Sequence, residues 1–149
     1  MIRGYLPAMD DTAPFHDLIG LTVDEWRDGF ARLALLVDGR HHNRSGVLHG
    51  GVLLSLIDQA GGYSGLFCTV PGNVRRAVTV DLNTHFTGQV TEGRITAEGR
   101  VVTAGNSIFF TRTEVFGPDG KLVAFGSGTH RWRTGSNKPE GVPADTPLR

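Results

Sequence analysis

The residue types that could carry out chemistry are concentrated between Asn43 and Asp58. In this segment His49 precedes Gly50 and Gly51, and an apolar pattern with helical spacing begins at the glycines. The first backbone N–H groups of a helix lack acceptors within the helix and lie at the positive end of its dipole. They can therefore stabilise a developing oxyanion, and the missing side chains of the two glycines would let a substrate carbonyl approach the backbone.

Asp58 is the candidate catalytic carboxylate. It lies within an otherwise apolar helical pattern, where burial of an unpaired carboxylate would be costly. It could act as a general base on water or attack a substrate directly as a nucleophile, and the sequence leaves these two roles open. The alternative is a structural carboxylate on the surface of the helix.

The separation between Gly50 and Asp58 predicts that one site requires two subunits. The two residues are eight positions apart, so they stand about 12 Å apart along a helix that rises 1.5 Å per residue. Reacting groups must come within about 3 to 3.5 Å of each other. If both residues serve one site, Gly50 of one subunit must meet Asp58 of another, and the chain must form a homodimer.

A long helix over residues 50–67 would position this segment, because its apolar residues recur at steps of three and four. The second half of this helix contains Gly61, Gly62 and Gly65. Each glycine costs about 1 kcal/mol relative to alanine in a helix interior. We therefore expect close packing against a sheet to stabilise the helix.

Strands are expected on both sides of this helix. One strand is predicted before it, over residues 30–38. After the helix, the alternation of Val78, Val80, Leu82 and Phe86 with polar residues predicts a strand with one buried face. Three further strands are predicted at residues 94–103, 107–116 and 121–132. These elements indicate the α+β class, with one long helix lying on a curled antiparallel sheet.

The chain has the composition of one domain. We expect residues 1–133 to form it, with an N-terminal extension of about residues 1–14, and the polar, proline-containing residues 134–149 to be a disordered tail. Basic and acidic residues are equal at 15 each, which argues against a nucleic-acid partner. Cys68 is the single cysteine, and no signal or membrane-spanning segment is visible. A cytoplasmic protein without a membrane or metal site is therefore expected.

The spacing of the candidate residues resembles that of a known family. Asn43 is followed six residues later by His49-Gly50-Gly51, and Asp58 comes nine residues after the histidine. Together with the strand at residues 78–83, this pattern resembles the PaaI-like or acyl-CoA thioesterase 13-like branch of the hotdog thioesterase superfamily. The resemblance covers about residues 38–132. It implies a hotdog fold, in which a curled antiparallel sheet wraps around one long central helix, and a homotetramer built as a dimer of dimers.

The resemblance also implies roles for individual residues. The Gly50 N–H would polarise the thioester carbonyl, while Asn43 and His49 would order the helix entrance and the substrate or water. Asp58 of the facing subunit would be the base or nucleophile. Thr79, where some relatives have serine, would help orient the water through its hydroxyl.

Residues that would bind the substrate can be named on the same grounds. They are Gly51, Val80 and the turn Gly105, Asn106 and Ser107. Many relatives carry a basic residue in this turn near the CoA phosphates, whereas this chain has Asn106. Arg75, Arg76, Arg100 or Arg112 could replace that contact, and the sequence does not choose among them.

These observations predict an acyl-CoA thioesterase that hydrolyses an acyl- or aryl-acyl-CoA to the free acid and CoA. No cofactor is expected, because CoA is part of the substrate. Two alternatives remain open: a non-catalytic acyl-CoA-binding hotdog module, and a dehydratase acting on hydroxyacyl thioesters.

Overall fold

The computed structural model describes residues 13–148 of the chain. Its elements in chain order are α1 (Pro14–Ile19), β1 (Leu21–Arg27), β2 (Phe30–Val37), the 3-10 helix η1 (Gly39–His41), α2 (Gly50–Ser64), β3 (Asn73–Val74), β4 (Ala77–Phe86), β5 (Gly93–Ala104), β6 (Ile108–Phe116), β7 (Leu122–Trp132) and β8 (Val142–Pro143). Six strands form one antiparallel sheet in the order β1-β2-β5-β6-β7-β4, and β3 pairs separately with β8. Most of the predicted N-terminal extension, residues 1–12, lies outside the described residues.

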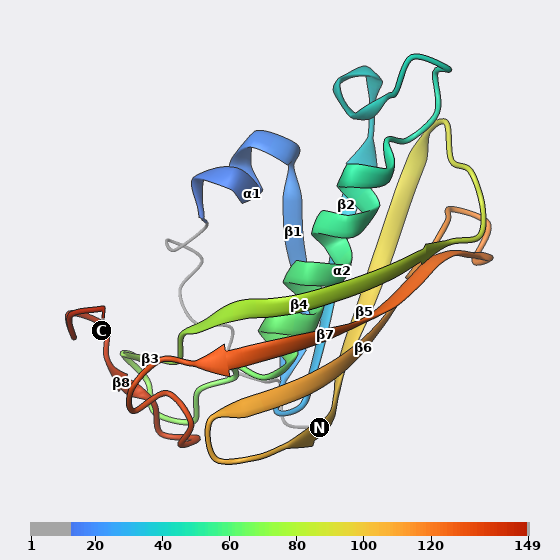
Figure 1. The fold of residues 1–149 in the computed structure, drawn as a ribbon. Coiled ribbons are helices and arrows are strands. Elements are labelled where there is room, and N and C mark those ends of the chain that lie inside the picture. The colour runs from blue at the N-terminus through green and yellow to red at the C-terminus, as the bar shows by residue number, and fades with distance from the viewer. Residues whose placement is uncertain (1–12, 149) are drawn as a thin grey trace.

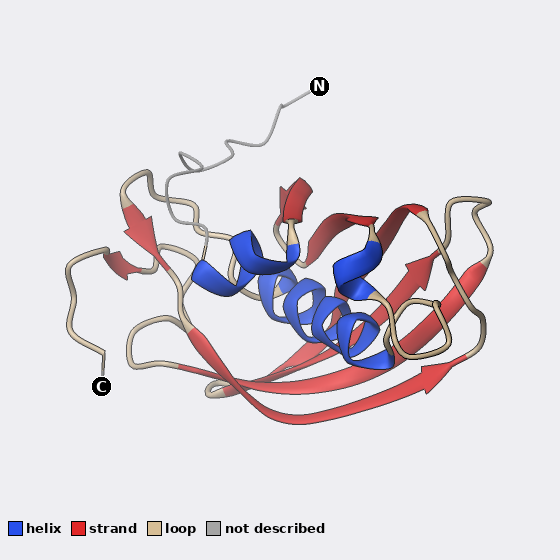
Figure 2. Cartoon of the chain, turned by 90° about the horizontal axis from the view of Figure 1, so that it is seen from above, coloured by secondary structure: helices blue, strands red, loops and turns tan. Residues whose placement is uncertain are grey.

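The long helix α2 lies in the concave side of the six-stranded sheet (Figure 1), and Figure 2 shows the long strands curving beneath it. Its buried face carries Leu53, Leu56, Ile57 and Ala60, which are at most 4% exposed and recur at steps of three and four. These side chains pack with apolar residues of the sheet in one core. The α+β hotdog architecture predicted from the sequence is therefore confirmed.

The helix approaches the sheet very closely, as its glycines predicted. A Cβ atom at Gly61 would lie 2.7 Å from Thr111 Oγ1, and one at Gly99 on β5 would lie 2.1 Å from the backbone oxygen of Ala60. Real Cβ atoms do not approach other atoms this closely. Both glycines therefore allow backbone and sheet to meet where any larger residue would push them apart.

The helix ends three residues earlier than the predicted residue 67. Ser64 is its last residue, and the N–H of Gly65 turns back to the carbonyl of Gly62. The indole of Trp132 donates to the Gly65 carbonyl at 3.0 Å. Tertiary contacts of this kind end the helix, although the apolar period continues beyond it.

Strand β4 differs from the prediction of one buried face. It is an edge strand of the sheet, and Val78, Val80 and Phe86 remain 36%, 59% and 57% exposed. The register with β7 shifts between Thr79 and Asp81, which leaves Val80 as the extra residue of a bulge. The strand is exposed because it has a neighbour on one side only and the bulge interrupts its alternation.

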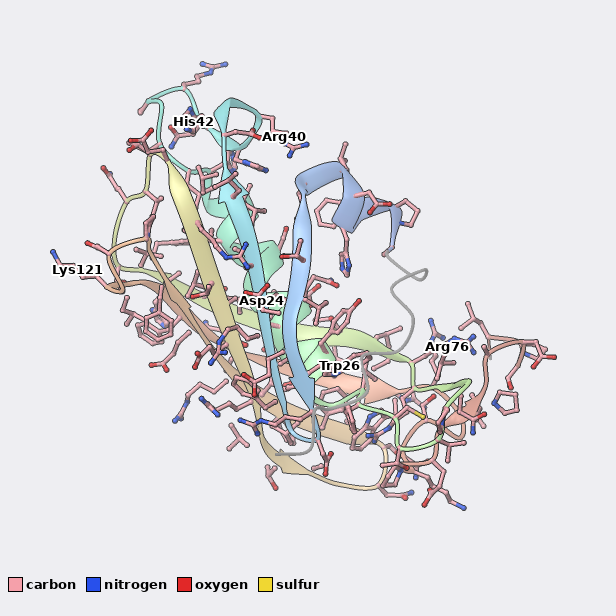
Figure 3. The ribbon with its side chains drawn as sticks, turned by 180° about the vertical axis from the view of Figure 1, so that it is seen from behind. Asp24, Trp26, Arg40, His42, Arg76 and Lys121 are labelled. Atoms are coloured by element: carbon pink, nitrogen blue, oxygen red, sulfur yellow. The ribbon has the colours of Figure 1, made fainter. Side chains whose placement is uncertain are left out.

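The C-terminal residues 134–148 are not the disordered tail that their composition suggested. Ser136 is fully buried and accepts a hydrogen bond from the backbone N–H of Arg76 at 3.0 Å. The guanidinium groups of Arg75 and Arg76 also donate to backbone carbonyls of this segment, and Figure 3 shows Arg76 beside it. Their acceptors there belong to Ser136, Asn137, Ala144 and Thr146. These bonds order a segment that has little apolar surface of its own.

Two N-terminal elements were not predicted from the sequence. Strand β1 pairs with β2 and forms the second edge of the sheet. Helix α1 precedes it and ends at Gly20, whose φ of 74° suits a glycine C-cap. Within residues 13–148, none of the helices is long and apolar enough to span a bilayer.

Candidate active site

The Asp58 carboxylate is held from two sides. Its Oδ1 accepts a hydrogen bond from the Thr79 hydroxyl at 2.6 Å, and its Oδ2 accepts one from the Gln59 side-chain amide at 2.9 Å. Asp58 itself is half-buried on α2, and Thr79 belongs to the exposed edge strand β4. The structure thus brings together two of the predicted site residues, and each carboxylate oxygen has one fixed donor.

His130 is a member of this cluster that the sequence analysis missed. Its Nδ1 lies 3.4 Å from Thr79 Oγ1, and its Nε2 lies 3.2 Å from Thr111 Oγ1. The ring is 1% exposed and stacks on Phe109 with a centroid distance of 4.9 Å. The only signal in the sequence was a histidine within an alternating strand pattern, and nothing there links it to Asp58.

Burial lowers the pKa of the His130 imidazole, and the negative charge of Asp58 opposes that shift. The neutral ring fits the hydrogen bonds around it. Because the Thr79 hydroxyl donates to Asp58, its oxygen can accept a hydrogen bond from His130 Nδ1–H, and His130 Nε2 can then accept one from the Thr111 hydroxyl.

A small pocket opens beside the carboxylate. It has a volume of about 100 Å³, and polar and apolar groups share its lining. The lining residues are Asp58, Gln59, Gly62, Tyr63, Leu66, Ala77, Thr79 and His130. The site can therefore place a small group or a water molecule next to Asp58. Within residues 13–148, no group of three or more His, Cys, Asp or Glu side chains could hold a metal ion.

The entrance of α2 forms a second cluster. His49 is the N-cap, and its Nδ1 accepts the Gly51 N–H at 2.8 Å. The Gly50 N–H has no acceptor among the described residues. Of the two glycine donors predicted to face a substrate, Gly51 is thus already occupied, and Gly50 alone remains free. This arrangement makes His49 a cap that orients the first turn.

Asn43 organises the loop that leads into this entrance. Its side-chain oxygen accepts the N–H groups of Ser45 and Val47 at 2.8 and 3.3 Å. Its backbone N–H donates to the carbonyl of Val47 at 2.8 Å. These bonds leave the amide nitrogen of the side chain without a partner in the described part of the chain, so it remains available as a donor near the helix entrance.

The two clusters do not meet within one chain. Gly50 is the first residue of α2 and Asp58 is its ninth, so they lie about 12 Å apart along the axis. The ring of Phe86, at the far end of β4, lies against Gly50, where a Cβ atom would be 3.3 Å away. Strand β4 therefore runs along α2 with Thr79 at Asp58 and Phe86 at Gly50.

The predicted turn at residues 105–107 lies at the C-terminal end of α2. The backbone N–H of Trp132 donates to the Ser107 carbonyl at 3.0 Å, and its indole donates to Gly65. The Asn106 side chain accepts a hydrogen bond from an asparagine of the C-terminal segment at 3.1 Å. In one chain this turn is therefore far from the helix entrance.

The four arginines considered as phosphate ligands are not equivalent. Arg75 and Arg76 are engaged by the backbone of the C-terminal segment. Arg100 pairs with Glu98 at 3.1 Å and covers a phenylalanine ring. Arg112, opposite Arg100 on β6, is exposed and has no ion pair within residues 13–148.

Comparison with known proteins identifies the family. The family description "Thioesterase superfamily" matches residues 45–124, more than half of the chain, from the helix entrance to β7. The chain belongs to the thioesterase superfamily. This confirms the resemblance to the hotdog thioesterases. Together with relatives named as acyl-CoA thioesterases, it shows that the chain is a thioester hydrolase.

Relatives of this thioesterase include a human enzyme and two bacterial proteins of known structure. Human acyl-coenzyme A thioesterase 13 is 28% identical over 131 residues, which cover 86% of this chain and 91% of that protein. The conserved protein PA5202 of Pseudomonas aeruginosa superimposes with a TM-score of 0.76 at 31% identity, over 85% of this chain and 99% of that one. A mutant of the phenylacetic acid degradation protein PaaI from Thermus thermophilus gives a TM-score of 0.69 at 28% identity, over 80% and 98% of the chains.

The lowered pKa of His130 predicts a pH-dependent stability. In the unfolded chain the imidazole has its ordinary pKa of 6.5, so the unfolded state takes up the proton first as pH falls. The neutral, buried ring contributes fully to the free energy of unfolding above about pH 6.5. Below that pH the free energy of unfolding should decrease. His130→Phe keeps a ring against Phe109 but cannot titrate. Melting temperatures measured between about pH 7.5 and pH 5 should therefore vary less for the variant than for the wild type, and parallel curves would contradict the assignment.

Proposed function

We propose that this thioesterase hydrolyses an acyl-CoA to a free acid and CoA. The observation that carries the proposal is the Asp58 carboxylate, held by the Thr79 hydroxyl at 2.6 Å on the wall of a small pocket. A carboxylate so placed can accept a proton from water or attack a thioester carbon. Human acyl-coenzyme A thioesterase 13, to which the chain is similar, acts as its name states on acyl-CoA.

The proposed chemistry assigns one role to each cluster. Asp58 takes a proton from water as the water oxygen attacks the thioester carbon, and Thr79 fixes the carboxylate. The Gly50 N–H, with the positive end of the α2 dipole, stabilises the oxyanion. Collapse of the tetrahedral intermediate expels the CoA thiolate, which takes up the proton. Direct attack by Asp58 would pass through an anhydride and uses the same residues.

A complete site of this kind requires a homodimer. Among residues 13–148, one edge of strand β4 has no strand partner, and its valines are exposed. Such an edge can pair with a second copy of itself. Since β4 carries Thr79 near Asp58 at one end and Phe86 near Gly50 at the other, antiparallel pairing would bring opposite ends together. Asp58 of one subunit would then face Gly50 of the other. Two such dimers would form the homotetramer implied by the resemblance.

The first test replaces the carboxylate. Asp58→Asn keeps the size of the side chain and loses the base, so thiol release from an acyl-CoA panel should fall by at least about a hundredfold. Single-turnover measurements separate this step from product release. Retained turnover in the variant would overturn the role of Asp58. Binding by the wild type without thiol release would indicate the non-catalytic module, and an enoyl product would indicate the dehydratase.

A second test removes the free N–H at the helix entrance. Gly50 is the first residue of α2, where proline is tolerated, and His49 before it is extended with ψ of 135°. Gly50→Pro should therefore preserve the helix and lower kcat by about a hundredfold or more. Gly50→Ala is the matched control, because it adds a similar carbon facing Phe86 and keeps the N–H. Equal activity of the two variants would exclude an oxyanion role for this donor.

Mixing two inactive variants tests whether the site is shared. When Asp58→Asn and Gly50→Pro subunits are exchanged, a heterodimer contains one site with both native residues and one site with neither. Thiol release should then recover to about a quarter of the wild-type value, because half of the dimers carry one intact site of two. No recovery, despite subunit exchange confirmed by native mass spectrometry, would place both residues in the same chain's site.

A further inference from the structure

A hydrogen-bonded chain reaches Asp58 from the N-terminal helix α1. His16 Nε2 lies 2.7 Å from Gln59 Oε1, and Gln59 Nε2 lies 2.9 Å from Asp58 Oδ2. We propose that His16 and Gln59 are positioning residues, which together fix the orientation of the Asp58 carboxylate for thioester hydrolysis. This inference rests on the proposed function, because it concerns how the assigned carboxylate is held.

The contact between Gln59 and Asp58 needs an explanation of its own. Adjacent residues on a helix point about 100° apart, so their side chains do not normally meet. Here the Gln59 side chain turns back along the helix surface to reach its neighbour. A partner on its other side can hold it there, and His16 is that partner.

The chemistry of the three groups fixes the direction of each hydrogen bond. An ionised carboxylate only accepts, so the amide nitrogen of Gln59 must face Asp58. The amide oxygen then faces His16, and because this oxygen also only accepts, His16 Nε2 must carry a proton. A proton on His16 Nε2 therefore determines which end of the Gln59 amide is presented to Asp58.

His16 is built into the structure as a buried group. Its side chain belongs to α1 and is 3% exposed, whereas its neighbours Phe15, Asp17 and Leu18 on α1 are exposed. Figure 2 shows α1 on the opposite side of α2 from the long strands. The His16 ring contacts that of Tyr63 at 5.7 Å between centroids, so it approaches α2 from outside the sheet.

Two chains of donors thus converge on one carboxylate. Thr79 donates to Oδ1 from β4 and Gln59 donates to Oδ2 from α2. Thr79 in turn contacts His130 of β7, and Gln59 contacts His16 of α1. If the hydrogen bond from Thr79 or the one from Gln59 is lost, the carboxylate can rotate about the hydrogen bond that remains. The position of the oxygen that contacts water is then no longer fixed.

Two substitutions of His16 separate positioning from packing. His16→Phe keeps a ring against Tyr63 and lacks the N–H donor, whereas His16→Gln loses the ring and keeps an N–H that can reach Gln59 Oε1. If His16 positions the carboxylate, His16→Phe should lower kcat by about tenfold and change KM by less than about twofold. His16→Gln should recover most of the wild-type kcat. Melting temperatures should rank in the opposite order, with His16→Phe the more stable variant.

Gln59→Met should lower kcat as His16→Phe does, and the double variant should be no worse than either single one, because the two residues act as one unit. Leu18→Gln is the control on the same helix as His16, since the Leu18 side chain is 68% exposed, and the activity of this variant should equal that of the wild type. Wild-type kcat in His16→Phe, or a kcat order that follows the melting temperatures, would overturn the inference. Absence of thiol release by the wild type would instead refute the proposed function.

Discussion

The structure depends on how closely α2 lies against the sheet. No Cβ atom fits at Gly99, because it would lie 2.1 Å from the backbone oxygen of Ala60. Gly61 on the helix is confined in the same way by Thr111. This close contact brings the middle of the helix within reach of the edge strand, so that a short aspartate side chain can meet Thr79. With a larger spacing, the carboxylate would have faced a gap that only a longer side chain could bridge.

Much of this arrangement follows from local patterns in the sequence. The helical period after Gly50 and the alternation in the later strands set the architecture, because each reflects one face packed on a common core. The spacing from Asn43 to Asp58 pointed to the family that the comparison then showed, and it predicted two half-sites. Thr79 was named from resemblance, and the structure places its hydroxyl on Asp58.

Other features depend on residues that are distant in sequence. His130 contacts Thr79 across 51 positions, and its strand pattern is that of any core histidine. Residues 134–148 are ordered by guanidinium groups about 60 to 70 residues earlier, so their own polar composition gave the wrong prediction. Of the buried face predicted for strand β4, Leu82 packs on the core, whereas Val78, Val80 and Phe86 are exposed, because alternation does not reveal whether a strand lies at an edge or contains a bulge. Strand β1 is half-exposed along most of its length, which weakens the periodic signal.

The two histidines that contact the hydrogen-bond donors of Asp58 lie far apart in the sequence. His16 belongs to the first helix and His130 to the last long strand. Their partners, Gln59 and Thr79, hold one carboxylate oxygen each. A site organised in this way needs residues of α1 and β7 in contact with Gln59 and Thr79, so local order in the central segment is not sufficient for it.

The hydrogen bonds from Arg75 and Arg76 to the C-terminal segment limit where this protein can be shortened. Composition alone would place the domain boundary near residue 133, and a chain expressed only to that position would retain every residue of the candidate site. Such a truncation would remove the carbonyl acceptors of two adjacent arginines and the buried Ser136. Those arginines lie three and four positions before Thr79 in the chain. A shortened chain should therefore keep residues up to at least Thr146, and affinity tags are better placed beyond them.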